Sequence, residues 1–373
     1  MPNPMKIPFV DLARQFRAIE AELTTAFHDV GHSGVYIMGE RLESFEAKAA
    51  EFCGVRHAIG VADGSDALFL ILKALGIGPG DEVITVPNSF IATAWTIVAT
   101  GARPVFVDVA EDMNMDPDRL ESAFTPRTRA VLPVHLTGRP AEMDAINEIA
   151  RRRGVAVVED AAQAIGARYR GTRVGALGTA AGFSLHPLKN LGVYGDGGLV
   201  TTADDQLATT VRKLRNHGLK NRDECEVWGY NSRLDALQAA FAEIKLGHLE
   251  SWNARCREIA ARYHDGLLDL VTVPADKPWE ECVYHNFVLR TDRRDALVSH
   301  LLRRGVDTRV HYPIPIHLQE AAKGLGYAEG DFPNSEAFAK TMISLPIYPE
   351  LNDDEVAYVI SAVREYFNQP NGS

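Results

Sequence analysis

The spacing of hydrophobic and polar positions changes along the chain. In residues 11–30 apolar side chains recur every three or four residues, which is the spacing of an amphipathic helix. A second helix is expected from residue 40 onward. Neither segment carries candidate chemistry, so we expect both helices to pack against the body of the protein or against another subunit.

From residue 57 onward short apolar runs alternate with helical patterns. Strands are expected at 57–62, 82–86, 104–109, 129–135 and 155–159, with helices at 67–75 and 91–100. A further apolar run, ending at Ser184, reads as the tip of another buried strand. This alternation predicts an α/β fold whose mixed, mostly parallel sheet is flanked by helices on both faces.

After residue 245 the pattern changes again. The spacing predicts helices over 246–267, 294–304 and 353–367, and strands over 284–289 and 308–312. These elements suit a smaller C-terminal α+β domain, and 373 residues are enough for a large domain and a smaller one. We therefore divide the chain into a large domain, 1–250, and a small domain, 251–373.

Composition and charge exclude several classes of protein. The net charge of −11 argues against non-specific binding of nucleic acid. No apolar run is long enough to span a membrane, and the N-terminus lacks the apolar core of a signal peptide. Four scattered cysteines without a paired spacing favour a reducing compartment and argue against a zinc site. We expect a cytoplasmic protein without a metal ion.

Candidate chemistry gathers where strands end, which is where ligands bind in such sheets. Gly64 and Ser65 open a helix after the first strand and could bind an anion, although the motif alone favours a plain helix cap by Asp63 or Ser65. Phe90 lies in the loop that leaves the strand at 82–86, and it could stack on a flat ligand or belong to the core. Asp160 ends an apolar strand, where its carboxylate needs a partner unless it caps the next helix.

A glycine-rich break in the chain carries Lys189. The segment 185–198 contains Pro187 and four glycines between two strand-like runs. A lysine held in such a turn can lie in a cleft, where an amine of lowered pKa forms a Schiff base with a carbonyl. The alternative for this segment alone is a surface lysine in a loop.

Pyridoxal 5′-phosphate unites these features. It needs a lysine for its aldehyde, a carboxylate for its ring nitrogen, an anion pocket for its phosphate and an aromatic cover for its ring. The candidates for those four roles are Lys189, Asp160, Gly64 and Ser65 together with Ser184, and Phe90. Each signal is weak alone, but together they occur in the right order on an α/β sheet.

The chain also resembles the DegT family of pyridoxal-phosphate-dependent sugar aminotransferases, a branch of fold type I. The resemblance covers almost the whole length, and its most specific segments are VVEDAAQAIGARYRG (157–171) and GFSLHPLKNLGVYGDGGLVTT (182–202). Further matching segments are GSDALFLILKALGIGPGDEVITVPNSFIATA (64–94), GYNSRLDALQAA (229–240) and HYPIPIHLQ (311–319).

The resemblance implies a role for each cofactor residue. Lys189 is the Schiff-base lysine and Asp160 is the partner of the pyridine nitrogen. Gln163 bonds the ring hydroxyl, and Phe90 covers the ring. The phosphate is held by Gly64, Ser65 and Ser184, and by Asn231 of a neighbouring subunit, so that a homodimer shares its active sites.

Substrate contacts are less defined by the sequence. His311, Tyr312 and His317 lie on a segment stiffened by two prolines and could bind sugar hydroxyls or phosphates, or be purely structural. Arg233 is a further candidate for an anionic group of the substrate. His186 stands where many relatives have an aromatic residue, which leaves the wall of the substrate pocket open.

The expected reaction is a ping-pong transamination that serves amino-sugar or polysaccharide biosynthesis. By resemblance the donor is L-glutamate and the acceptor a dTDP- or UDP-linked keto sugar, with a 3-keto group favoured by the segment 311–319. The alternatives are a 4-keto sugar, a keto-cyclitol, or a non-catalytic regulatory protein on the same fold. Lys189 argues against a related dehydratase branch in which a histidine replaces that lysine.

Overall fold

The computed structural model describes residues 5–368. Its helices are α1 (Leu12–Ser33), α2 (Glu40–Cys53), α3 (Gly64–Ala74), α4 (Ile91–Ala99), α5 (Pro117–Leu120), α6 (Met143–Arg153), α7 (Asp205–Leu214), α8 (Ala236–Leu267), α9 (Arg294–Arg303), α10 (Pro333–Thr341) and α11 (Asp353–Asn368). Short 3-10 turns are η1 (Glu121–Ala123), η2 (Leu136–Gly138), η3 (Ile316–Leu318) and η4 (Glu320–Leu325).

The strands of the main sheet are β1 (His57–Val61), β2 (Glu82–Thr85), β3 (Arg103–Phe106), β4 (Thr128–Val131), β5 (Ala156–Asp160), β8 (Ala180–Ser184) and β9 (Gly198–Thr202). Smaller sheets contain β6 (Arg168–Tyr169), β7 (Thr172–Arg173) and β10 (Glu280–Glu281), and β11 (Phe287–Arg290) with β12 (Met342–Leu345).

The main sheet places the candidate residues at one edge. Its order is β1-β9-β8-β5-β4-β2-β3, and the strands from β8 to β3 are parallel. Because β9 is antiparallel to both β1 and β8, β1 points the same way as the parallel strands. The exits after β1, β2, β5 and β8 therefore lie on the same side, and the predicted mixed, mostly parallel sheet is confirmed.

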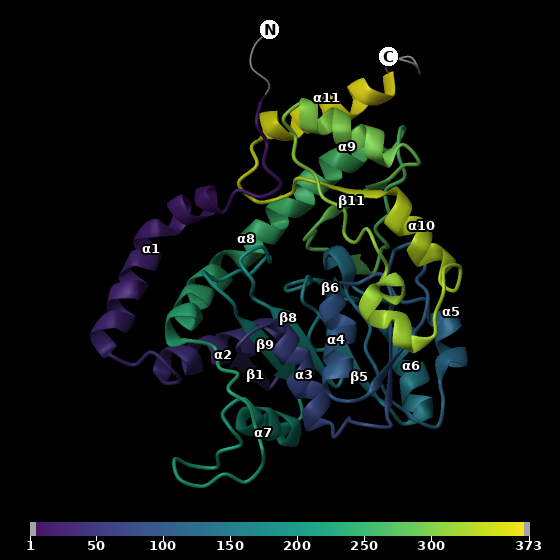
Figure 1. Ribbon diagram of the computed structural model, residues 1–373. Helices are drawn as coiled ribbons and strands as arrows, with labels where there is room; N and C mark the ends of the chain where they lie inside the picture. The colour runs from purple at the N-terminus through teal and green to yellow at the C-terminus, as the bar shows by residue number, and fades with distance from the viewer. Residues whose placement is uncertain (1–4, 369–373) are drawn as a thin grey trace.

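Helices cover both faces of this sheet, as the alternation of apolar side chains requires. In β8, Phe183 packs into the cluster formed with α2 and α8, whereas Ala180 packs into the cluster formed with α3 and α7. In β9, Leu199 packs into the cluster with α2 and α8, and Val200 packs into the cluster with α3 and α7. Figure 1 shows the layers that result, with α8 crossing diagonally from the sheet toward the C-terminal elements.

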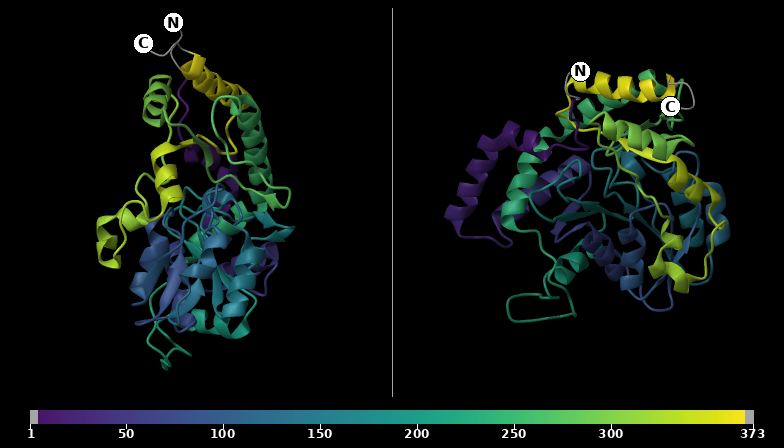
Figure 2. Two further views of the ribbon diagram at one scale, coloured as in Figure 1. Left: turned by 90° about the vertical axis from the view of Figure 1, so that its right-hand side faces the viewer. Right: turned by 45° about the horizontal axis from the view of Figure 1, so that its top comes forward.

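The C-terminal elements have a core of their own, built from the end of α8, β11, β12, α9 and α11. Ile7 belongs to this core, and its backbone N–H donates to the carbonyl of Gly305. Figure 2 shows the N-terminal segment running beside these C-terminal helices. The division at residue 250 stays a prediction. The structure shows that α8 runs through that position and that the N-terminal segment packs with the C-terminal elements.

Several predicted elements have other bounds in the structure: the strands expected at 104–109, 129–135 and 284–289 are 103–106, 128–131 and 287–290, and three further differences have a clear cause. The helix expected at 67 begins at Gly64, because Asp63 caps it by accepting from the N–H groups of Ser65 and Asp66. The helix expected at 246 begins at Ala236, where an alanine-rich start hides the apolar spacing. The strand expected at 308–312 is wrong, because only Arg309 pairs, across to Ser344, before the two prolines. No helix within residues 5–368 is long and apolar enough to cross a bilayer.

Candidate active site

The start of α3 and the end of β8 touch. A Cβ added to Gly64 would lie 2.6 Å from Cβ of Ser184 and 2.9 Å from its Cα, so only glycine fits there. Because Asp63 already occupies the N–H groups of Ser65 and Asp66, the free donors at this turn are the hydroxyls of Ser65 and Ser184. The helix cap and the anion site considered from the sequence are thus compatible.

Asp160 ends β5 and is 5% exposed. Its Oδ2 accepts a 2.7 Å hydrogen bond from the Thr93 hydroxyl, and its Oδ1 accepts one of 3.2 Å from the N–H of Ala162. Burial raises the pKa of Asp160, against the opposing effects of Thr93, Ala162 and the charge of Lys189. The carboxylate is oriented by neutral donors and has no cation bonded to it in the described part of the chain.

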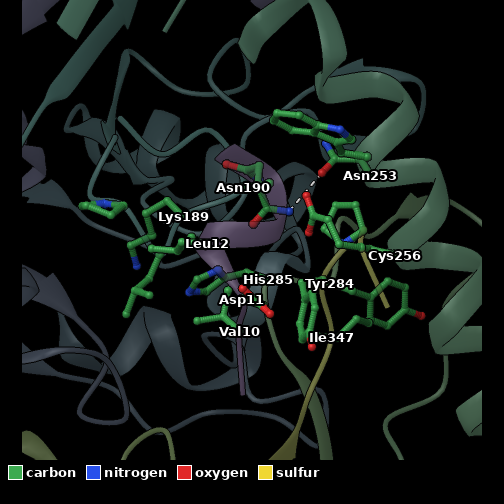
Figure 3. A pocket seen from close by; sticks show the side chains of 17 residues that line it. Val10, Asp11, Leu12, Lys189, Asn190, Asn253, Cys256, Tyr284, His285 and Ile347 are labelled. Atoms are coloured by element: carbon green, nitrogen blue, oxygen red, sulfur yellow. Dashed lines mark hydrogen bonds between the residues drawn. The ribbon is translucent and has the colours of Figure 1, made fainter. Parts of the chain in front are cut away.

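Lys189 lies close enough to Asp160 for the charge of each group to act on the other. Burial lowers the pKa of its amine to about 8, and the charge of Asp160 is the one opposing influence. Within residues 5–368 its Nζ has no hydrogen-bond or salt-bridge partner, and Figure 3 shows it among the residues that line a pocket with Asn190 and His285. A half-buried amine without a partner, close to a buried carboxylate, can act as a nucleophile and as a proton carrier.

Gln163, Tyr312 and Phe90 form a wall beside Asp160. The side-chain amide of Gln163 donates to the Tyr312 hydroxyl at 3.1 Å and accepts from the N–H of Thr137 at 2.7 Å. The ring centroids of Tyr312 and Phe90 are 5.8 Å apart, and Phe90 is 54% exposed, which excludes a core role. The N–H of Ile316 donates to the carbonyl of Pro87, which ties the two loops together.

Three histidines surround Lys189. His311 precedes Tyr312 in the chain, and its Nδ1 lies 2.9 Å from the Ser344 hydroxyl. Burial, with smaller effects of Lys189 and Arg309, lowers the pKa of His311 to about 4. The pKa of His285 is also lowered by burial and by Lys189, with contributions from His311 and His186. His311 and His285 are therefore neutral near pH 7, and the exposed His186 lies next to them at the rim.

Of three further predicted contacts, His317 is wrong, whereas Arg233 and Asn231 stay predictions. His317 is buried, with its Nε2 3.0 Å from Glu336 and its ring against Phe332, so it serves the structure rather than a ligand. The Arg233 guanidinium donates to Asn216 at 3.1 Å. Asn231 is exposed and pairs with Asn216 across an isolated β-bridge.

These residues fit pyridoxal 5′-phosphate. The absence of a side chain at Gly64 lets the start of α3 lie against Ser184, and Ser65 and Ser184 supply hydroxyl donors. Asp160 offers a buried carboxylate for a protonated ring nitrogen, and Lys189 offers a free amine. Such a donor set matches the needs of this cofactor.

Two residues of the site were missed from the sequence. Thr93 lies in the first turn of α4, inside the matching segment 64–94, and the apolar run around it hid its role. His285 sits between elements, at the end of an ordinary apolar pattern, and no spacing marks it. Both become visible only when the sheet brings the strand exits together.

The comparisons with known proteins agree with this geometry. A model of the DegT/DnrJ/EryC1/StrS aminotransferase family matches residues 17–364. The dTDP-3-amino-3,4,6-trideoxy-alpha-D-glucose transaminase of Streptomyces venezuelae is 50% identical, over 97% of this chain and 96% of its own. The UDP-N-acetyl-3-dehydro-alpha-D-glucosamine 3-aminotransferase of Acidithiobacillus ferrooxidans is 41% identical, over 96% and 97%. The crystal structure of S. venezuelae DesV in complex with a ketimine intermediate superposes with a TM-score of 0.96 at 49% identity, covering 98% of this chain and all of that one.

Proposed function

The chain belongs to the DegT/DnrJ/EryC1/StrS aminotransferase family, and we propose that it moves the amino group of L-glutamate to carbon 3 of a nucleotide-linked keto sugar. It is an enzyme that uses pyridoxal 5′-phosphate. The observation that carries the proposal is an unbonded Lys189 amine on which the charge of the buried Asp160 carboxylate acts.

The protein residues have distinct tasks in this reaction. When bound, the cofactor supplies an electron sink for carbanion chemistry at the α-carbon of the amino acid. Asp160, oriented by Thr93, keeps a proton on the ring nitrogen, because a buried carboxylate favours a cationic partner. Lys189 Nζ takes a proton from carbon and returns it, a task suited to an amine whose pKa is near the working pH.

The phosphate and the ring have their own supports. Gly64, Ser65 and Ser184 would hold the phosphate at the start of α3, where N–H dipoles favour an anion. Gln163 has one amide hydrogen left after its bond to Tyr312 and would donate it to the ring hydroxyl. Phe90 would cover the open face of the ring.

The sugar would enter past the histidine side of the cleft. His311 and Tyr312 line it, and His186 stands at its rim. Neutral imidazoles can donate to and accept from sugar hydroxyls without repelling the Lys189 amine. The two relatives described above act at carbon 3 of a dTDP- or UDP-linked sugar by their names. Those names favour the 3-keto substrate over the 4-keto and cyclitol alternatives.

We also infer a homodimer with shared active sites. Asn231 ends the segment 216–231 and Arg233 follows it; this segment projects from the body at the lower end of Figure 1. That segment carries Trp228, which is 94% exposed, and α1 and the turn after it expose Phe27 and Tyr36. Large apolar side chains exposed in this way mark a surface that is covered by another protein. A second copy is the occupant that would also bring Asn231 to the phosphate.

The test of the substrate uses the reverse half-reaction. The purified enzyme, loaded with pyridoxal 5′-phosphate, is mixed with dTDP- and UDP-linked sugars aminated at carbon 3 or carbon 4, and the cofactor absorbance is followed. The proposal predicts a fast spectral change with a 3-amino sugar and at most a slow one with 4-amino sugars. A preference for 4-amino sugars would contradict it.

The test of the dimer combines mass and binding. Light scattering should give a dimer, and Asn231→Ala should weaken binding of pyridoxal 5′-phosphate while the dimer persists. A monomer with full activity would overturn this part of the proposal. We place the enzyme in the cytoplasm because its cysteines, Cys53, Cys225, Cys256 and Cys282, are all free thiols.

A further inference from the structure

Three polar side chains of α8 form a row along one face of the helix. Gln238, Lys245 and Asn253 are separated by seven and eight residues. Two turns of an α-helix take about 7.2 residues, so these positions lie above one another. Figure 1 shows α8 as the long helix that passes from the sheet to the C-terminal elements.

Each of the three side chains is bonded to the segment that follows Lys189. The Gln238 amide accepts from the N–H of Tyr194 at 2.9 Å and donates to its carbonyl at 3.0 Å. Lys245 Nζ donates to the carbonyl of Gly192 at 2.6 Å. The Asn253 side chain accepts from that of Asn190 at 2.9 Å, as the dashed line in Figure 3 shows.

Residues 190, 192 and 194 are thus attached in turn to three successive levels of one helix. We call Gln238, Lys245 and Asn253 the α8 ladder. The residues around Lys189 also contact one another within the segment 186–192. The N–H of Lys189 donates to the carbonyl of His186 at 2.8 Å, and a Cβ on Gly192 would lie 2.4 Å from the carbonyl oxygen of Pro187. The backbone at Gly192 is therefore packed against the turn that carries Lys189.

The middle level is the unusual one. Lys245 is 1% exposed, and its Nζ also donates to Gln15 of α1 at 2.9 Å and lies 4.2 Å from the centre of the Tyr194 ring. Burial lowers the pKa of Lys245 to about 8, with Glu350 opposing. A buried lysine is costly, and the contacts of this one join α8, α1 and the Lys189 segment.

We propose that Lys245 is a positioning residue for Lys189, and that the α8 ladder holds the Lys189 amine inside the cleft. The inference rests on the proposed function in taking Lys189 as the reacting amine. Lys245 touches neither the Asp160 carboxylate nor the cradle at Gly64, so it acts through the backbone of the segment 190–194. The N-terminal helix α1 takes part through Gln15.

The test measures Lys189 in the cofactor-free protein. Amine acylation followed by peptide mass spectrometry gives the pH midpoint of its reactivity, and titration with pyridoxal 5′-phosphate gives a dissociation constant. For Lys245→Met we expect the midpoint to move upward from about 8 toward the ordinary value of 10.5. The dissociation constant should rise about tenfold or more, as for a lost hydrogen bond to a charged group.

The control is Lys48→Met, which removes a lysine of α2 that pairs with Glu243 of α8 away from the segment. Gln238→Ala, compared with Gln206→Ala on α7, removes a partly exposed level without emptying the core. If Lys245→Met does not fold, Gln238→Ala tests whether the α8 ladder positions Lys189. We expect a smaller upward shift of the Lys189 midpoint in Gln238→Ala and none in either control.

A midpoint and dissociation constant equal to those of the unaltered protein, in a folded Lys245→Met or failing that in Gln238→Ala, would overturn the inference. The two proposals fail in different ways. If the unaltered protein bound no pyridoxal 5′-phosphate, the proposed function would fail, while the Lys189 midpoint in the cofactor-free variants would still judge the α8 ladder.

Discussion

The hydroxyl of Thr93 donates a 2.7 Å hydrogen bond to Oδ2 of Asp160, linking the first turn of α4 to the end of β5. The Ser89 hydroxyl lies 2.7 Å from the same Thr93 oxygen, so two hydroxyls form a chain that ends on the carboxylate. Burial raises the pKa of Asp160, and this hydrogen bond is the largest opposing effect. Thr93 therefore helps to keep Asp160 ionised.

Replacing Thr93 by valine keeps the shape and removes the donor. A hydrogen bond to a charged group contributes about 1.5–3 kcal/mol, so losing it should raise the pKa of Asp160 further. Because the ionised carboxylate is the active form, the acidic limb of kcat/KM should move to higher pH. The pH profile measures this shift. Ser89→Ala removes the hydroxyl one step further from Asp160 and should move the acidic limb less. An acidic limb that did not move in Thr93→Val would refute the role of Thr93 in keeping Asp160 ionised.

Gly64→Ala tests the cradle at the start of α3. Its new methyl group would lie 2.6 Å from Cβ of Ser184, so the two backbones must separate. The hydroxyl of Ser184 would move away from that of Ser65, and we expect the dissociation constant of pyridoxal 5′-phosphate to rise about tenfold, the loss of one modest hydrogen bond. Spectrophotometric titration measures it.

Gly247→Ala is the matched control, because a Cβ at that exposed position of α8 meets nothing within 4 Å. It should leave cofactor binding unchanged and stabilise the helix by about 0.5–1 kcal/mol. Equal cofactor affinity in the two variants would show that the cradle has no role.

Lys189 should give binding of the cofactor a distinctive pH dependence. Burial lowers its pKa to about 8, and the amine reacts only as the free base. The rate at which cofactor-free protein incorporates pyridoxal 5′-phosphate should therefore rise through pH 8 and then level off. Stopped-flow absorbance measures this rate, and a rate that still climbed near 10.5 would indicate an ordinary lysine.

The same shift affects stability with a definite sign. Between about pH 8 and 10.5 the unfolded chain holds a proton on Lys189 that the folded chain has released. The free energy of unfolding of the cofactor-free protein should gain from this group as pH rises across that window. Lys189→Met should remove that gain relative to the unaltered protein, as measured by urea denaturation at several pH values.

A buried ion pair stabilises the strand that leads to the cradle. Glu46 Oε1 accepts from the N–H of Gly60 at 2.8 Å and pairs with Arg215, whose Nη1 donates to the carbonyl of Gly60 at 2.8 Å. Glu46→Ala strands a buried guanidinium and should cost about 3–5 kcal/mol in urea denaturation. Asp205→Ala breaks the exposed contacts with Arg56 and His57 and should cost far less than Glu46→Ala. Similar losses in the two variants would contradict this account.

Much of the fold follows from the sequence because apolar spacing is local information. The strands ending near Val61, Thr85, Asp160 and Ser184 could be located from their runs, and parallel order then placed their exits together. Boundaries were less predictable. The cap by Asp63 extends α3 back to Gly64, and contact with the rest of the protein extends α8 through a stretch of alanines.

The site was only partly predictable, because its details depend on contacts between distant segments. Lys189 and Asp160 stand out by residue type and position, and in the structure the charge of Asp160 acts on the Lys189 amine. His317 looked equivalent to His311, yet Glu336, nineteen residues later, draws it into the core. Nothing in the spacing of Thr93 reveals that α4 will face the end of β5.

The central claim is that Lys189 is the residue that binds the cofactor covalently. Borohydride reduction of the purified protein with pyridoxal 5′-phosphate, followed by peptide mass spectrometry, tests it most directly. The account predicts one pyridoxyl group per chain, on Lys189, and none in Lys189→Ala. A pyridoxyl group on another lysine, or a Lys189→Ala protein that still carried one and turned over, would contradict it.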